Sequence, residues 1–228
     1  MFWSWIQPLI ENVKIQGQPG NQLVTIFHIP NELEKVGIGT DAVVVRHPSE
    51  PQVVFKCYAP GREQKRLDEY EVYRRLGDTP YFPVCFGMGD SFLVLSHERG
   101  PTLYECVSQG IVIPENIIAE VEAARRYVRN QGLNPRDLHL KNILLQEGHA
   151  KLLDVSEYLK PGDDARWDHL VQGYRLVYPL IRGRKIPVWL MERVKKTYFQ
   201  QVAGEFSVSE FARPFLSLLH REQEQDRP

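Results

Sequence analysis

The chain has 228 residues, 43% hydrophobic and 25% charged, which is long enough for one sizeable core or for two small lobes. Its formal net charge of -1 gives no broad basic field, so the composition argues against nucleic acid or an anionic membrane surface as a general partner. Residues 1–8 include aromatics but no basic region or long apolar run, which predicts no transmembrane segment. Three scattered cysteines without metal-ligand spacing favour a reducing, cytoplasmic location.

The first predicted elements are strands around a glycine-containing turn. Residues 23–29 alternate apolar and polar, which predicts a strand ahead of the main sheet. Residues 33–45 then hold Gly37 and Gly39 between two β-prone runs. Glycine lets a backbone approach phosphate oxygens closely, although such a turn alone more often marks a simple hairpin.

A strand with a single lysine follows, and then a helix. Residues 52–58 are strongly β-prone and carry Lys56 among apolar neighbours. Residues 62–76 have apolar side chains at helical spacing, which predicts one packed face that holds Leu67, Tyr70, Tyr73 and Leu76. Two further strands over 82–88 and 92–95 would complete a small, mostly antiparallel sheet with one helix.

A second helix leads to a polar loop and a hairpin. Residues 115–130 form an amphipathic pattern that ends at Gly132. Beyond the loop, apolar runs at 143–145 and 151–153 flank residues 146–149, which predicts two paired strands. If this pairing centres on Gly148, position 142 lies opposite position 154.

The open end of that hairpin is a candidate metal site. Asn142 and Asp154 would meet there and offer oxygen ligands to a hard cation such as Mg²⁺. Asp137 lies five residues before Asn142, on a loop held by its apolar neighbours, and its carboxylate could reach a hydroxyl beside a metal-bound phosphate. The simpler alternative is that these three residues only cap a turn and end two strands.

These motifs resemble those of protein kinases. Arg136-Asp137-Leu138 followed by Asn142 resembles the catalytic loop H-R-D-L-x-x-x-N, and 154–156 falls where that family has D-F-G. Residues 54–56 resemble the V-A-I-K strand. Gly37, Gly39 and Val44 match the glycine-rich pattern G-x-G-x-x-G-x-V, with Ala42 in place of the third glycine.

The resemblance implies an α+β, two-lobed fold, with a small antiparallel β-sheet lobe and a shortened, mainly helical lobe. It divides the chain into an N-terminal extension packed on the small lobe (1–31), a small lobe (32–96) and a large lobe (97–228). Helices are expected near 167–174, 188–202 and 210–219, and residues 223–228 should fray.

The resemblance also implies a function and a role for each site residue. The activity would be an ATP-dependent transfer of the γ-phosphate to a hydroxyl, with Mg²⁺ as cofactor. Lys56 would hold the α- and β-phosphates, paired with Glu69 or, as an alternative, Glu71. The remaining roles are nucleotide contacts for Gly37, Ile38, Gly39 and Val44, metal ligands for Asn142 and Asp154, and proton acceptor for Asp137.

Departures from the kinase pattern leave the substrate open. His139 gives D-x-H-x-x-N, which is similar to the loop of aminoglycoside and choline phosphotransferases, whereas Arg136 is the protein-kinase residue. We therefore favour Ser/Thr of a protein as acceptor and keep a small-molecule alcohol as an alternative. Asp168 would anchor the catalytic loop, which leaves a short activation segment without an A-P-E motif. That segment, Ala42 and Ser156 favour a third reading, a pseudokinase that acts as a nucleotide-binding or scaffolding module.

Overall fold

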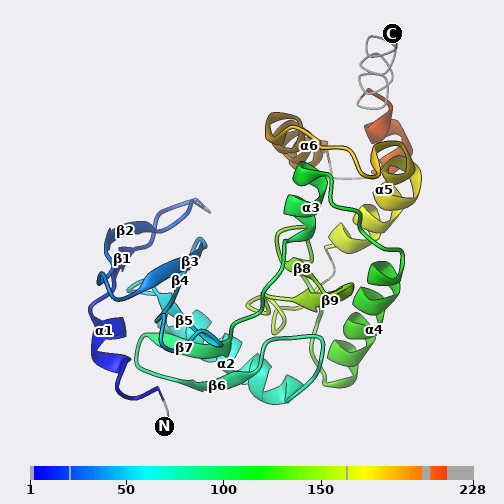
Figure 1. Ribbon diagram of the computed structural model, residues 1–228. Helices are drawn as coiled ribbons and strands as arrows, with labels where there is room; N and C mark the ends of the chain where they lie inside the picture. The colour runs from blue at the N-terminus through cyan, green and yellow to red at the C-terminus, as the bar shows by residue number, and fades with distance from the viewer. Residues whose placement is uncertain (1–2, 21, 163, 202–205, 215–228) are drawn as a thin grey trace. The chain divides into compact units, whose positions relative to one another are not determined.

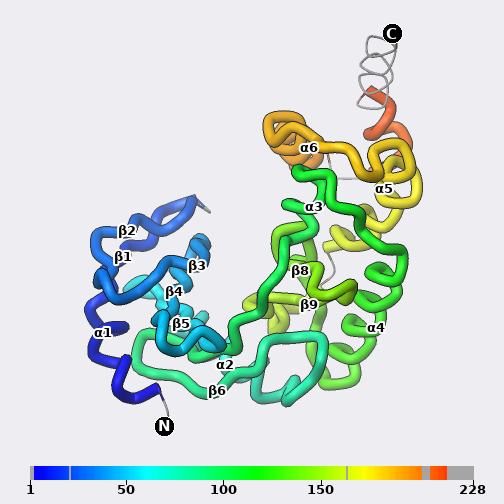
Figure 2. The backbone as a smooth tube through the Cα atoms, in the orientation of Figure 1, coloured from blue at the N-terminus to red at the C-terminus, as the bar shows by residue number. Residues whose placement is uncertain are grey.

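The computed structural model describes residues 3–20, 22–162, 164–201 and 206–214, and its fold is α+β, as the sequence predicts (Figure 1). Two compact units emerge, and each combines segments that are distant in the chain. The first comprises Met1–Arg99, Val121–Arg136 and Lys151–Gly162; the second comprises Gly100–Glu120, Asp137–Ala150 and Asp163–Pro228. Figure 2 follows the same backbone as a tube.

A five-stranded antiparallel sheet forms the centre of the first unit. Its strand order is β3-β4-β5-β7-β6, and α2 (Glu63–Leu76) packs against β6 and β7. Because each connection is a hairpin or a short excursion through one helix, neighbouring strands run antiparallel. The strands are β3 (Glu34–Ile38), β4 (Ala42–Arg46), β5 (Val53–Tyr58), β6 (Cys85–Met88) and β7 (Phe92–Ser96).

One face of this sheet is covered by the N-terminal segment. That segment contains α1 (Gln7–Glu11) and a separate two-stranded sheet of β1 (Lys14–Gln16) and β2 (Thr25–His28). Alternate residues of the large sheet point into a shared core, as the two-residue period of a strand requires. Burying each large apolar side chain contributes about 1.5–3 kcal/mol. The core members include Trp3, Ile6, Ile10, Ile15, Val43, Val45, Phe55, Cys57, Phe92 and Val94.

The packed face of α2 differs from the prediction. Tyr73 and Leu76 are buried as expected, but the side chain of Leu67 is 41% exposed. Glu69 is buried instead, with no exposed surface. Apolar spacing alone could not reveal this, because the buried polar residue has its partners on β5.

Leu152, the last residue of β9 (His149–Leu152), and Leu153 are held in the first unit by two hydrogen bonds. The Leu152 N–H donates to the Tyr81 carbonyl (2.9 Å), and the Tyr73 hydroxyl donates to the Leu153 carbonyl (3.2 Å). Asp154 follows immediately, so its place in the first unit is set by α2 and by the turn at Tyr81, which hold its neighbours.

The second unit is mainly helical. It contains α3 (Leu103–Gln109), the start of α4 (Asn116–Asn130), β8 (Ile143–Gln146), α5 (Arg166–Ile181) and α6 (Val188–Gln201). A capping box begins α3, because the Thr102 hydroxyl accepts from the Glu105 N–H while the Glu105 carboxylate accepts from Thr102. Residues 208–214 are helical; the rest of the predicted helix over 210–219, the final residue of the one over 188–202 and the predicted frayed end lie outside the described residues.

The hairpin of β8 and β9 corrects one register prediction. Its turn is the pair Glu147 and Gly148, which have φ of 52° and 87°, the left-handed conformations typical of a two-residue hairpin turn. The turn thus centres between these residues and not on Gly148. Counting outward, position 142 is equidistant with 153, so the expected pairing of 142 with 154 is wrong by one residue.

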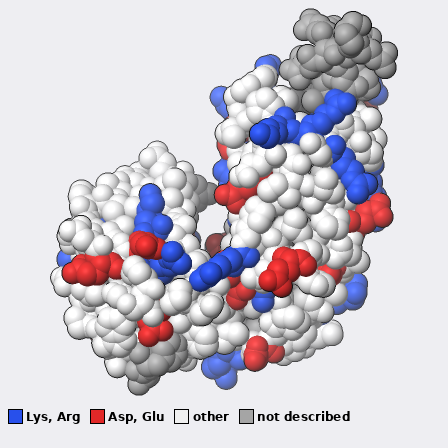
Figure 3. Space-filling model, viewed as in Figure 1, with Lys and Arg blue, Asp and Glu red and all other residues white. Residues whose placement is uncertain are grey.

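Charged side chains of both signs occur on the visible face of each unit, among large uncharged areas (Figure 3). Within the part of the chain that the structure describes, no helix combines the length and the apolar composition needed to cross a membrane.

Candidate active site

Three of the predicted site residues lie in one row across the sheet of the first unit. Gly37 of β3 pairs with Val44 of β4, and Val44 pairs in turn with Lys56 of β5. Directly paired residues on adjacent strands project from the same face of a sheet. The row therefore lies on the face opposite the N-terminal core, because Phe55 and Cys57 point into that core.

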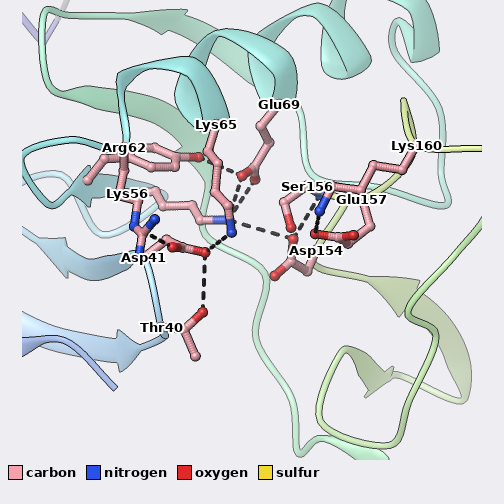
Figure 4. Close-up of polar contacts among 11 residues, drawn as sticks. Thr40, Asp41, Lys56, Arg62, Lys65, Glu69, Asp154, Ser156, Glu157 and Lys160 are labelled. Carbon is pink, nitrogen blue, oxygen red and sulfur yellow. Dashed lines mark hydrogen bonds and ion pairs between the residues drawn. The ribbon is translucent and has the colours of Figure 1, made fainter. Parts of the chain in front are cut away.

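Lys56 forms a buried ion pair with Glu69 of α2 (Figure 4). The Lys56 Nζ lies 2.7 Å from both carboxylate oxygens of Glu69, and the Tyr58 hydroxyl donates to Glu69 Oε2 at 2.6 Å. Glu71, the alternative partner in the sequence, instead accepts hydrogen bonds from Arg74 and Arg75 on the surface. The structure thus places Glu69 against the lysine.

A second carboxylate faces the same ammonium group. Asp154 Oδ1 lies 3.8 Å from Lys56 Nζ, and the same oxygen accepts the Ser156 N–H at 3.0 Å (Figure 4). The Asp154 side chain is 37% exposed, whereas Glu69 has no exposed surface. Lys56 therefore lies between one buried and one solvent-accessible carboxylate.

These neighbours determine the charge of the lysine. Burial alone would lower the pKa of Lys56, but the carboxylates of Asp154 and Glu69 outweigh it and raise that pKa above its ordinary value. Burial raises the pKa of Glu69, and the Lys56 ammonium offsets part of that increase. The charged form of Lys56 is therefore favoured, which suits it to holding phosphate oxygens.

The glycine-containing turn has features that the sequence did not reveal. The Gly39 N–H donates to the Ala42 carbonyl at 2.8 Å, so this N–H closes the turn. Asp41, at the tip, lies 2.8 Å from Arg62 Nε and 2.5 Å from Lys65 Nζ (Figure 4). These ion pairs connect the turn to the start of α2, and only an acidic residue two positions after Gly39 could have hinted at them.

Neither glycine is required by the fold itself. Gly37 and Gly39 do not have left-handed φ, and an added Cβ would meet its nearest neighbours at 3.8 Å and 3.5 Å, which are ordinary contacts. Ile38, between them, is 38% exposed. Small residues at these positions therefore need an explanation other than internal packing.

The second unit contains the predicted loop around Asp137. Asp137 has a left-handed φ of 55°, and its N–H donates to Asp164 Oδ2 at 2.8 Å. The Asn142 side-chain N–H donates to the Asp137 carbonyl (3.2 Å), and the Asn142 backbone N–H donates to the His139 carbonyl (2.9 Å). Asp137 and Asn142 are thus held together in one tight loop.

Two partners of this loop were not found from the sequence. Arg166 donates through Nη1 to Asp137 Oδ1, and Asp164 receives the backbone N–H groups of both Asp137 and Arg166. The sequence assigned an anchoring role to Asp168, which lies in the first turn of α5. Asp164 stands one residue before the N-cap Ala165 of that helix, and an Asp so close to a helix start was the available signal.

The donor set fits a hard cation. Asn142 uses its side-chain N–H toward the Asp137 carbonyl, so its oxygen is the atom suited to ligation, and Asp154 supplies a solvent-accessible carboxylate. Asp137 and Asn142 belong to the second unit and Asp154 to the first. The convergence of all three on one ion therefore stays a prediction.

Comparison with known proteins finds similarity to a curated protein and to a solved structure. The chain is 31% identical over 177 residues to a Bacillus subtilis (strain 168) protein named "Putative serine/threonine-protein kinase YrzF", and the match covers 75% of this chain and 82% of that protein. A mutant kinase domain of Mycobacterium tuberculosis PknI, known from a crystal structure, is 16% identical with a TM-score of 0.44, covering 68% of this chain and 75% of that one. No protein-family profile matches the chain.

Proposed function

This chain belongs to the protein kinase-like superfamily, and we propose that it is an ATP-dependent kinase that transfers the γ-phosphate to a hydroxyl group, with Mg²⁺ as cofactor. The observation that carries the proposal is the Lys56–Glu69 ion pair with Asp154 beside it. A partly buried lysine paired with a fully buried glutamate is suited to neutralising phosphate charge, and such perturbed ion pairs cluster at functional sites.

Each residue has a task in this proposal. Lys56 binds the α- and β-phosphates, and Glu69 fixes the direction of the lysine side chain. Gly37 and Gly39 let the phosphates approach the turn, which accounts for two glycines that internal packing does not require. Ile38 and Val44 add apolar contacts with the nucleotide.

The remaining tasks belong to the metal ligands and the base. Asn142 and Asp154 would hold Mg²⁺, which neutralises charge on the phosphates when bound. Asp137 orients the acceptor hydroxyl and takes its proton as the oxygen attacks phosphorus. The tight loop that joins Asp137 to Asn142 keeps the two side chains in a fixed relation.

We propose a serine or threonine side chain of a protein as the acceptor. The name of the Bacillus subtilis relative, "Putative serine/threonine-protein kinase YrzF", supports this choice, as does Arg136 before Asp137. A small-molecule alcohol is the second candidate, and His139 two residues after Asp137 is the observation that favours it.

Transfer of labelled phosphate from ATP tests the proposal. The purified chain with Mg²⁺ should label itself or a generic protein acceptor, and Asp137→Ala should reduce the rate by about 100-fold or more, since general-base catalysis contributes about 10²–10⁴-fold. Label on a small alcohol alone would replace the protein acceptor by the second candidate. No transfer to protein, alcohol or water would identify a pseudokinase.

The metal assignment has a separate test. Asp154→Ala should abolish the Mg²⁺ dependence of ATP binding, because it removes the charged ligand while leaving Lys56 and Glu69 in place. Binding is measured by titration calorimetry with and without Mg²⁺. An unchanged Mg²⁺ dependence would contradict the assignment of this carboxylate.

A further inference from the structure

Arg166 lies beside Asp137, held by a carboxylate that fixes both residues. Arg166 Nη1 donates to Asp137 Oδ1. Asp164 accepts the Arg166 N–H at 3.2 Å through one oxygen and the Asp137 N–H at 2.8 Å through the other. The Phe199 ring of α6 lies under the guanidinium, with its centroid 5.5 Å from Cζ. Three independent contacts thus direct this arginine.

The backbone on both sides of the contact is strained. Asp137 has φ of 55° and Ala165 has φ of 50°. Among the described residues, the other non-glycine residue with positive φ is Glu147, which sits in a hairpin turn where this conformation is ordinary. Left-handed φ costs about 1–2 kcal/mol for a residue such as Ala165 and less for Asp137, because Asp adopts this conformation more readily, and such strain concentrates at functional sites.

The position of Arg166 in its helix is also unfavourable. It is the first residue of α5, and the preceding Ala165 offers no side-chain cap. The N-terminus of a helix carries partial positive charge, which disfavours a cation there. The carboxylates of Asp137 and of Asp164, the latter 3.7 Å from Arg166 Nε, hold the cation there, where it is available to an anionic ligand.

The chemistry of the proposed reaction identifies that ligand. An acceptor hydroxyl bonded to Asp137 lies about 3 Å from the carboxylate and attacks a phosphorus atom about 3–3.5 Å away. A guanidinium on the same carboxylate is thus within side-chain reach of the phosphoryl oxygens. Its planar fork matches such oxygens. Both side chains are about one-third exposed, 34% for Arg166 and 33% for Asp137, so a ligand can reach them.

We propose, building on the proposed function, that Arg166 is a catalytic residue that binds the oxygens of the phosphoryl group during transfer. The bond between the acceptor oxygen and the γ-phosphorus forms, and the bond from that phosphorus to the β,γ-bridging oxygen breaks. The acceptor proton passes to Asp137, and ADP leaves with the bridging oxygen. Arg166 exchanges no proton; it stabilises charge on the phosphoryl oxygens in the transition state.

Binding of a transition-state analogue tests this role without an acceptor. The probes are ADP alone and ADP with aluminium fluoride, each with Mg²⁺, titrated against wild type, Arg166→Gln, Arg166→Lys and Arg175→Gln. Arg175 lies exposed on the same helix and controls for loss of one positive charge. Wild type should bind ADP more tightly with aluminium fluoride than without it.

Arg166→Gln should lose about tenfold or more of that preference, with affinity for ADP alone changed less than about twofold. Arg166→Lys should keep part of it, because the charge remains, and Arg175→Gln should match wild type. Thermal unfolding of each variant checks the fold. If Arg166→Gln unfolds at a lower temperature than wild type, the Arg166→Lys variant is the one to compare. A purely structural role of Arg166 predicts that Arg166→Lys has the same preference for ADP with aluminium fluoride over ADP alone as wild type.

Three outcomes would overturn the role of Arg166. In the first, Arg166→Gln keeps the preference for ADP with aluminium fluoride. In the second, it loses affinity for ADP alone and for ADP with aluminium fluoride by the same factor. In the third, it transfers phosphate faster than wild type, which would mean that the arginine inhibits transfer. Failure of the proposed function looks different. There, wild type shows no preference for aluminium fluoride and transfers no phosphate to protein, alcohol or water.

Discussion

The two halves of the proposed machinery are built by opposite means. In the first unit, Lys56 and Glu69 project from the middle of a strand and of a helix, and their contact is fully buried on the glutamate side. In the second unit, Asp137 lies on a loop with left-handed φ, and its partners are partly exposed. A strand and a helix joined by an ion pair hold the Lys56 ammonium group in a fixed position. A loop with left-handed φ holds the Asp137 carboxylate where a ligand can approach it.

This contrast indicates where stability is tied to function. Removing one member of a buried ion pair leaves the other charge buried without its partner. The half that contains Lys56 and Glu69 therefore also stabilises the fold. The loop half stores strain, so changes there should weaken function more than stability. The predictions below measure this difference, beginning with the largest effect.

Lys56→Ala should lower the free energy of unfolding by about 3–5 kcal/mol, because Glu69 remains with no exposed surface and loses its cation. Urea denaturation at pH 7 measures it. Glu71→Ala is the matched control, since its arginine pairs are on the surface and should contribute less than about 1 kcal/mol. Replacing Lys56 by Met and Glu69 by Leu together should recover most of the loss.

A loss of unfolding free energy below about 1 kcal/mol for Lys56→Ala would contradict the contrast between the two units. It would mean that Glu69 is hydrated or protonated in the variant without a cost in stability. The ion pair would then serve ligand binding alone. Both halves of the machinery would be separable from the stability of the fold.

The regular half could largely be predicted from the sequence. The β-prone run around Lys56 and the apolar spacing of the following helix define a strand and a helix, and the two-residue period of a strand puts alternate residues on one face. The kinase-like pattern favoured Glu69 with Glu71 as the alternative, and only the contact with Lys56 separates the two. The elements α1 and β1 were missed, since five and three residues are too few to show a period.

The loop half could be predicted only in part. The motif located Asp137 and Asn142, because their spacing within one loop is local. Asp164 and Arg166 lie 27 and 29 positions beyond Asp137. The place of Asp164 just before a helix hinted at a local role, but the sequence did not show that this role is contact with Asp137. The sequence also did not show that Glu147 has left-handed φ. The predicted centre of the hairpin, at Gly148, was therefore half a residue too far along the chain.

Asp164→Ala should cost about 1–2 kcal/mol of unfolding free energy, because the N–H groups of Asp137 and Arg166 lose their acceptor. Hydrogen exchange should report faster exchange of the Asp137 amide than in wild type. Asp168→Ala is the comparison, since the sequence motif assigned the anchoring role to Asp168. Faster exchange of that amide in Asp168→Ala alone would return the role to Asp168.

Ala165→Gly should have the smallest effect and the opposite sign. With φ of 50°, Ala165 bears a Cβ where glycine is comfortable, at a cost of about 1–2 kcal/mol. Glycine loses more backbone entropy on folding, so the expected net gain is about 0.5–1 kcal/mol. Ala119→Gly, at an exposed site of α4, should instead lose about 1 kcal/mol.

Thermal or urea unfolding of the two glycine variants decides between strain and ordinary packing at Ala165. Stabilisation with slower phosphate transfer would show that the strain at Ala165 maintains the contact of Arg166 with Asp137, since a relaxed backbone lets the first turn of α5 shift. Equal losses in both variants would contradict the strain argument. The loop half would then be as fully supported by the fold as the buried ion pair, and the contrast between the units would vanish.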